Sequence, residues 1–341
     1  MSRRTRRLKK EQEYEEYYNR IDNIPDDPPI KKFDILFETN NLNFELNNEK
    51  NIVFFILFHN DLEMLKRTID KLKYKNNHHF LINICPDINP NVKSELINYF
   101  NKIKYVSILY CGYINYPAST ELKIIWSIKE WLLGQKNWDF LICLGQSDYS
   151  LFSGSKLNNL IGEKTWCSMD VKKYKKEELI AYKDLLGRFI NGIYASENKK
   201  KSFRRKDLWL YKFLGNIEIS WGLPLSSGGI FSRETVKYLI NNKLCKIIYM
   251  FCLYMSCAAV EHYWHTCFQL DYFKDKIYDK KSCHMEWARG RPGQIPGTSN
   301  TFLTLSEWDI IENEYKKGTP FIRKFNSKLD KEILDKIDLL N

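Results

Sequence analysis

The sequence lacks the short patterns that mark several common enzyme classes. It contains no Gly-x-Gly-x-x-Gly after its first predicted strand, no Gly-Lys-Ser/Thr loop and no Gly-x-Ser-x-Gly. The phosphate cradles of Rossmann dehydrogenases and P-loop proteins are therefore missing, as is the nucleophile elbow of serine hydrolases. Asp-x-Asp is absent too, so no carboxylate pair of that spacing is present to hold a divalent cation.

Long apolar runs and paired cysteines are also missing. The most apolar stretch, residues 244–260, is interrupted by Lys246, which predicts a buried helix rather than a membrane span. The nine cysteines are scattered without a C-x-x-C pair, as in a protein of a reduced compartment. The basic N-terminus is not followed by an apolar segment, so it is not a secretory signal. We expect a soluble, cytoplasmic protein without a membrane span.

What the chain does contain is positive charge and aromatic side chains. Lys and Arg number 53 against 42 Asp and Glu, which gives a net charge of +11, and aromatic residues make up 15%. This balance favours an anionic partner such as a nucleotide, a phosphorylated substrate, nucleic acid or an acidic membrane. Residues 1–50 carry an Arg-rich cluster, three prolines and an Asn-rich stretch, so we expect a basic, largely irregular leader that packs little.

Strands and helices alternate after the leader. Continuous apolar runs predict buried strands, and amphipathic stripes between them predict helices. The strands are expected at 52–58, 80–84, 105–110 and 139–144, and the helices at 61–73, 91–102 and from 117. This order is typical of an α/β fold with a Rossmann-like, mainly parallel sheet flanked by helices, and we see no linker within residues 51–341.

Polar side chains at the carboxyl ends of these strands are candidate ligand-binding residues, because ligands bind there in parallel sheets. His59 and Asn60 follow the first strand, Asp87 follows the second and Asp148 the fourth. Asp148 could bind a hydroxyl of a sugar or ribose, or it could cap the next turn.

A carboxylate in the second half is a candidate general base. Glu261 follows directly after the most apolar stretch of the chain, where burying an unpaired charge would cost free energy of folding. Partial burial raises the pKa of such a carboxyl toward that of a base that deprotonates a hydroxyl. The alternative is a Glu paired with a nearby Lys or His. His262 and His265 could face a zinc ion, but their order and the cysteine spacing fit no zinc pattern, so no metal is expected.

Basic residues near the C-terminus could meet the charge of a nucleotide diphosphate. Arg grips phosphate oxygens bidentately and Lys acts as a point charge. The candidates are Arg289, Arg291, Arg323 and Lys324. Each could instead be solvated surface charge, although Phe321 and Phe325 flank the last pair and indicate that it is held near the core.

Five segments, in this order, resemble the core-2/I-branching N-acetylglucosaminyltransferases and the related peptide O-xylosyltransferases. They are residues 54–60 (FFILFHN), 138–151 (WDFLICLGQSDYSL), 227–234 (SGGIFSRE), 260–266 (VEHYWHT) and 321–325 (FIRKF). The resemblance spans about residues 52–338. It adds Ser227 and Gly228 to the candidate nucleotide- or sugar-binding residues.

The resemblance implies a glycosyltransferase A-type fold and inverting, metal-independent transfer from a UDP-sugar, with GlcNAc or xylose favoured. The acceptor is a hydroxyl of a glycan or protein, and no cofactor is needed besides the co-substrate. Glu261 falls on the family's general base and Lys324 on its diphosphate-binding lysine, with Arg291 or Arg289 as the accompanying arginine. Residues 51–150 would then bind the nucleotide, and residues 151–341 the acceptor and the diphosphate.

Two other functions compete with this one. A basic, non-catalytic protein could bind nucleic acid through the Arg-rich leader, although we do not expect a nucleic-acid partner. A transferase-like fold without activity could bind glycans only.

Overall fold

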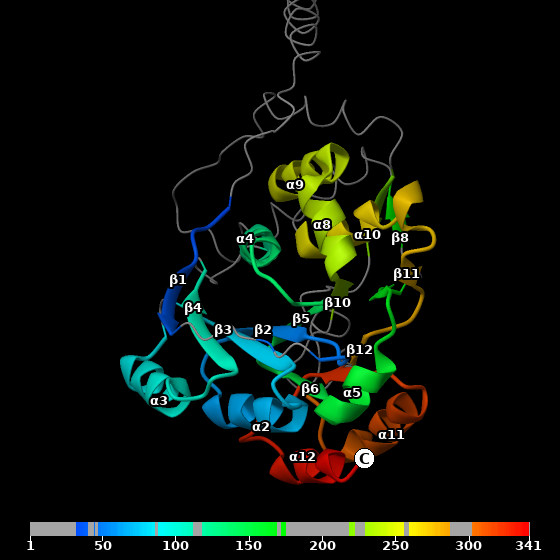
Figure 1. Cartoon of the computed structure of the whole chain (residues 1–341). Coiled ribbons are helices and arrows are strands. Elements are labelled where there is room, and N and C mark those ends of the chain that lie inside the picture. The colour runs from blue at the N-terminus through cyan, green and yellow to red at the C-terminus, as the bar shows by residue number, and fades with distance from the viewer. Residues whose placement is uncertain are drawn as a thin grey trace, which may run out of the picture.

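A large sheet with helices on both faces forms the centre of the molecule (Figure 1). The computed structural model describes residues 32–39, 44, 47–85, 88–111, 118–168, 172–174, 218–221, 229–255, 259–286 and 302–340. Its eight-stranded sheet has the order β1-β4-β3-β2-β5-β10-β7-β11. The strands are β1 (Leu36–Thr39), β2 (Ile52–Phe58), β3 (His78–Ile84), β4 (Val106–Tyr110), β5 (Phe140–Gly145), β7 (Thr165–Trp166), β10 (Gly229–Ser232) and β11 (Ile277–Tyr278).

The predicted alternation of strands and helices is confirmed. Strands β4, β3, β2 and β5 are parallel neighbours, whereas β1 and β10 pair antiparallel with β4 and β5. The α/β fold class expected from the sequence is therefore correct. The parallel strands β2 and β3 are buried on both faces, which explains why β2 is apolar at every position rather than at every second one.

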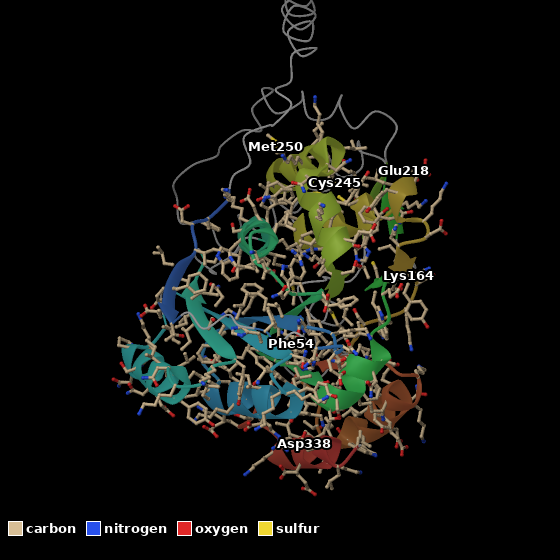
Figure 2. The ribbon with its side chains drawn as sticks, in the orientation of Figure 1. Phe54, Lys164, Glu218, Cys245, Met250 and Asp338 are labelled. Atoms are coloured by element: carbon tan, nitrogen blue, oxygen red, sulfur yellow. The ribbon has the colours of Figure 1, made fainter. Side chains whose placement is uncertain are left out.

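Two helical layers cover the sheet. In Figure 1, α2 (Leu62–Leu72) and α3 (Pro90–Phe100) lie below it, and α4 (Ala118–Leu133), α8 (Arg233–Asn241) and α9 (Lys243–Met255) lie above. Side chains along β2 alternate between the two layers: Phe54 packs in the core of the lower layer and Phe55 in that of the upper one. Figure 2 shows Phe54 at this central level and Cys245 and Met250 above it in α9.

Two smaller sheets complete the fold. One has the order β12-β13-β6, with β12 (Cys283–Met285), β13 (Phe321–Arg323) and β6 (Asp148–Ser150). The other pairs β8 (Lys172–Tyr174) with β9 (Ile219–Trp221). The remaining helices are α5 (Gly154–Leu160), α10 (Ala259–Cys267), α11 (Trp308–Lys316), α12 (Lys331–Asp338) and the 3-10 turns η3 (Asp271–Phe273) and η4 (Leu305–Glu307). Within the described ranges, no helix combines the length and apolarity needed to cross a membrane.

The expectation that the first fifty residues pack little is wrong for part of that segment. Phe33, Ile35 and Phe37 pack against the upper core, and the backbone N–H of Phe33 donates to Ser127 Oγ at 2.8 Å. These apolar residues recur at every second position, as in a strand with one buried face. The segment therefore covers the outer edge of β4 as strand β1.

Candidate functional site

The carboxyl end of β2 is held in place by Gln146, which follows β5. Its Oε1 accepts hydrogen bonds from the backbone N–H groups of His59, Asn60 and Asp61 at 2.8, 2.6 and 3.0 Å. Its Nε2 donates to Asn60 Oδ1 at 3.0 Å. His59 and Asn60 are exposed, so the predicted pair lies open at the carboxyl edge of the sheet. Gln146 was not singled out from the sequence, because its contacts join segments far apart in the chain.

The C-terminal segment reaches the same edge. The N–H of Phe325 donates to the carbonyl of Ser147 at 2.9 Å, just after β5. Ser327 donates to both carboxylate oxygens of Asp61, from its N–H at 3.0 Å and its hydroxyl at 2.6 Å. Asp61 also accepts from the N–H of Met64 and so caps α2. The predicted basic pair, Arg323 and Lys324, is thus fixed beside the ends of β2 and β5.

Asp148 and Arg323 form a buried ion pair within this arrangement. Asp148, only 1% exposed, opens β6 opposite Arg323 in β13, and its Oδ1 lies 3.3 Å from Arg323 Nε. Its Oδ2 accepts from the N–H of Gly145 at 2.7 Å and closes the turn after β5. Of the two roles considered for Asp148, these contacts are those expected of the turn cap.

Lys324 keeps a cationic group available at this edge. Burial, together with the charge of Arg323, lowers the pKa of its amine, and the charge of Asp148 partly opposes that shift. In the described part of the chain its Nζ has no ion-pair partner, and the Phe302 ring centroid lies 5.9 Å away. A half-buried amine that no described carboxylate pairs with directly is suited to binding an anion.

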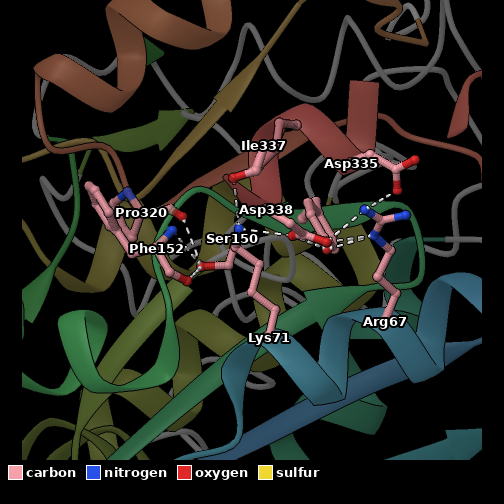
Figure 3. Close-up of polar contacts among 9 residues, drawn as sticks. Arg67, Lys71, Ser150, Phe152, Pro320, Asp335, Ile337 and Asp338 are labelled. Atoms are coloured by element: carbon pink, nitrogen blue, oxygen red, sulfur yellow. Dashed lines mark hydrogen bonds and ion pairs between the residues drawn. The ribbon is translucent and has the colours of Figure 1, made fainter. Parts of the chain in front are cut away.

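A groove of about 1170 Å³ begins beside Asn60. Its wall includes Lys328 and Lys331 from the C-terminal segment and passes along α2 and α3. At its far end Asp338 accepts from Lys71 Nζ at 2.9 Å and from Arg67 Nε at 2.8 Å, contacts that Figure 3 shows. Burial alone would raise the pKa of Asp338, but hydrogen bonds from Tyr149 and Lys71 and the nearby positive charges lower it. This cluster fastens α12 to α2.

Glu261 lies in the upper helical layer, in the first turn of α10, and is partly exposed. One turn further along the same helix face, His265 Nδ1 lies 3.4 Å from the thiol of Cys167, which follows β7. Because β7 runs parallel to β5, Cys167 marks the carboxyl side of the sheet. No ion pair joins Glu261 to Lys324, both of which are described.

Several of the residues predicted from the sequence are not among those that the structure describes. Asp87, Ser227, Gly228, Arg289 and Arg291 lie outside the described residues, and their roles stay predictions. His262 and His265 are buried. Among the side chains that the structure describes, no group of three or more His, Cys, Asp or Glu is gathered as a metal site would require.

Comparison with known proteins gives the family. The family model described as Core-2/I-Branching enzyme matches residues 52–314, more than half of the chain. No curated protein is a significant match. The match includes Glu261 and ends before β13, so Arg323 and Lys324 follow the matched segment. With its mainly parallel sheet and flanking helices, the chain belongs to the core-2/I-branching enzyme family and is a glycosyltransferase by family.

Proposed function

We propose that the protein is an inverting, metal-independent glycosyltransferase that moves GlcNAc or xylose from a UDP-sugar to a hydroxyl of a glycan or protein. The observation that carries the proposal is the amine of Lys324, half-buried and without an ion-pair partner in the described chain, beside the carboxyl ends of β2 and β5. UDP would lie over this edge, where His59 and Asn60 are exposed.

The reaction needs a base on one side of the sugar and a cation on the other. The acceptor hydroxyl gives its proton to Glu261 while its oxygen forms a bond to the anomeric carbon. The bond from that carbon to the diphosphate oxygen breaks on the opposite face, and UDP leaves with the electron pair. Lys324, with Arg289 or Arg291, stabilises the negative charge that develops on the leaving group.

Two features support the metal independence that we propose. The chain has no Asp-x-Asp, and a fixed amine placed beside the diphosphate can supply the positive charge that a cation supplies elsewhere. Arg323 contributes less to this charge, because Asp148 neutralises its guanidinium.

The first experiment is a screen of UDP-GlcNAc and UDP-xylose for thermal stabilisation and for release of UDP, with and without EDTA. We expect stabilisation by one of them and activity that EDTA does not change. Loss of activity in EDTA that Mn²⁺ restores would refute the role of Lys324 as a replacement for a metal.

The second experiment measures UDP affinity by calorimetry in Lys324→Met. Losing a charge-assisted contact to phosphate costs about 1.5–3 kcal/mol, which is about a 10- to 100-fold weaker Kd. The matched control is Lys336→Met, which removes an exposed amine of α12 that is not part of the groove wall. Equal affinities of wild type and Lys324→Met would contradict the proposed site.

A further inference from the structure

Lys129 is the most unusual charged residue in the upper layer. It lies in α4, is 0% exposed, and its Nζ has no hydrogen-bond partner among the residues described. Instead, Nζ lies 3.2 Å from the ring centroid of Phe231 and 3.5 Å from that of Trp264. The amine is therefore enclosed by two aromatic rings, which attract a cation through their electron-rich faces.

Among the described residues, no counter-charge accompanies this amine. The titratable groups that act on it are the thiols of Cys143 in β5 and Cys267 in α10. Burial raises the pKa of Cys143 to about 12 and that of Cys267 well above its usual value, so both stay neutral. Behind Cys267 lie further thiols, Cys245 and Cys252 of α9, and β10 carries no titratable residue. Within the part of the chain that the structure describes, the two rings are therefore what offsets the burial cost of the ammonium form.

The two rings belong to elements that carry proposed site residues. Trp264 lies three positions after Glu261 in α10, on an adjoining part of the same helix surface. Phe231 lies in β10, which follows Ser227 and Gly228 in the chain. A side chain that binds both rings therefore joins α4, β10 and α10 at one point.

We propose that Lys129 is a positioning residue whose amine, held between Phe231 and Trp264, fixes α10 against the sheet and so orients the carboxylate of Glu261. The inference rests on the proposed function only in naming Glu261 as the base. We call Lys129, Phe231 and Trp264 the aromatic clamp.

The clamp depends on protonation. Only the ammonium form has the charge that the ring faces attract, while a neutral amine binds them weakly. Burial lowers the pKa of Lys129 to about 7. The clamp should therefore be engaged in mildly acidic solution and loosen as the pH rises above neutrality.

The test compares Lys129→Met with Lys123→Met. Methionine has nearly the length of lysine and no charge, so it fills the space without binding the rings as a cation. Lys123 is the matched control, because it lies on the same helix, is partly exposed and faces a single ring, Phe33, at 5.6 Å. Turnover of UDP-GlcNAc is followed by UDP release between pH 5.5 and 9.

We expect Lys129→Met to lower kcat about tenfold or more, since small misplacements of a reacting group are costly. KM for UDP-GlcNAc should not change, because the diphosphate lies beside Lys324. Wild-type kcat should decline above a pH near 7, and this decline should be absent in Lys129→Met. An unchanged kcat and pH profile in Lys129→Met would overturn the proposal.

A second measurement does not depend on activity. Trp fluorescence of the wild type minus that of Lys129→Met reports the indoles that respond to the Lys129 amine, of which Trp264 lies 3.5 Å from it, and we expect this difference to titrate with a midpoint near pH 7. A flat difference would refute the clamp. Full activity of Glu261→Gln would refute the base and leave the fluorescence titration intact, so the two failures are distinguishable.

Discussion

Replacing Lys129 by methionine should stabilise the protein while it reduces activity. The pKa of the buried amine falls from 10.5 to about 7. Since one pKa unit corresponds to about 1.36 kcal/mol, keeping the ammonium form buried costs about 5 kcal/mol of folding free energy at pH 7. The attraction of the Phe231 and Trp264 ring faces for the ammonium form acts on this same pKa and is part of the net cost. We therefore expect Lys129→Met to raise the free energy of unfolding by about 4–5 kcal/mol at pH 7.

The pH dependence is a second test of this reasoning. The folded-state pKa of Lys129 is lowered, so its cost is fully present below about pH 7 and disappears as the pH approaches 10.5. Between those limits the unfolded chain binds the proton and the folded protein does not. The stability gap between Lys129→Met and wild type should therefore shrink by about 1.4 kcal/mol for each pH unit.

Urea unfolding at pH 7, 8 and 9, followed by circular dichroism, measures the gap directly. The control, Lys123→Met, removes a partly exposed amine from the same helix and reports the effect of a lysine-to-methionine change as such. A Lys129→Met protein that is less stable than wild type at pH 7, or a gap that does not change with pH, would show that the amine is not a buried, desolvated cation.

Three further outcomes are expected. Glu261→Gln should lower kcat about 10²–10⁴-fold, or about 3–5 kcal/mol, with UDP affinity by calorimetry unchanged; near-wild-type turnover would exclude it as the base. Asp338→Asn should destabilise the protein by about 1–3 kcal/mol at pH 7, because Arg67 and Lys71 lose their shared anion. The pKa of Asp338 is lowered, so this loss should fade below about pH 4 in urea unfolding, and a constant difference would contradict the ion-pair account. Gln146→Ala should lower the free energy of unfolding by about 1–2 kcal/mol, because three backbone N–H groups lose the side-chain oxygen that accepts their hydrogen bonds and water replaces it only in part. Unchanged thermal stability of this variant would disprove the bracing role of Gln146.

The central fold was predictable because its signals are local. Strand β2 is an unbroken apolar run, β3 contains the apolar run at residues 80–82, and helix α2 repeats its apolar side chains at helical spacing. Strand β1 was missed because its alternating residues lie in a polar, Asn-rich context, and their burial comes from contacts such as that of Phe37 with Trp131 of α4. Such contacts between distant segments leave no local signal.

The sequence allowed several residues of the candidate site to be named, but not the contacts that those residues make. Asp148 and Arg323 were both named, yet their pairing across β6 and β13 joins positions far apart in the sequence. Lys129 was not singled out, since in the stretch SIKEWLL a lysine looks like part of a solvated helix face. It is buried because α9 and α10, which follow much later in the chain, cover the side of α4 that would otherwise meet solvent.

Neighbouring positive charges explain why Arg323 and Lys324 should act differently. Two adjacent cations that are both largely buried repel one another, and each lowers the pKa of the other when it can lose a proton. Arg323 cannot lose its proton in the physiological range, so the fixed carboxylate of Asp148 compensates it in the folded protein. Lys324 has no such partner among the described residues, and its pKa is lowered. An incoming diphosphate would therefore supply an anion beside its amine and favour the charged form.

UDP binding to the wild type should therefore be accompanied by uptake of a proton at alkaline pH. Calorimetry in two buffers of different ionisation enthalpy would measure that uptake. Lys324→Met should abolish it, and persistence of proton uptake in this variant would place the responsible group elsewhere.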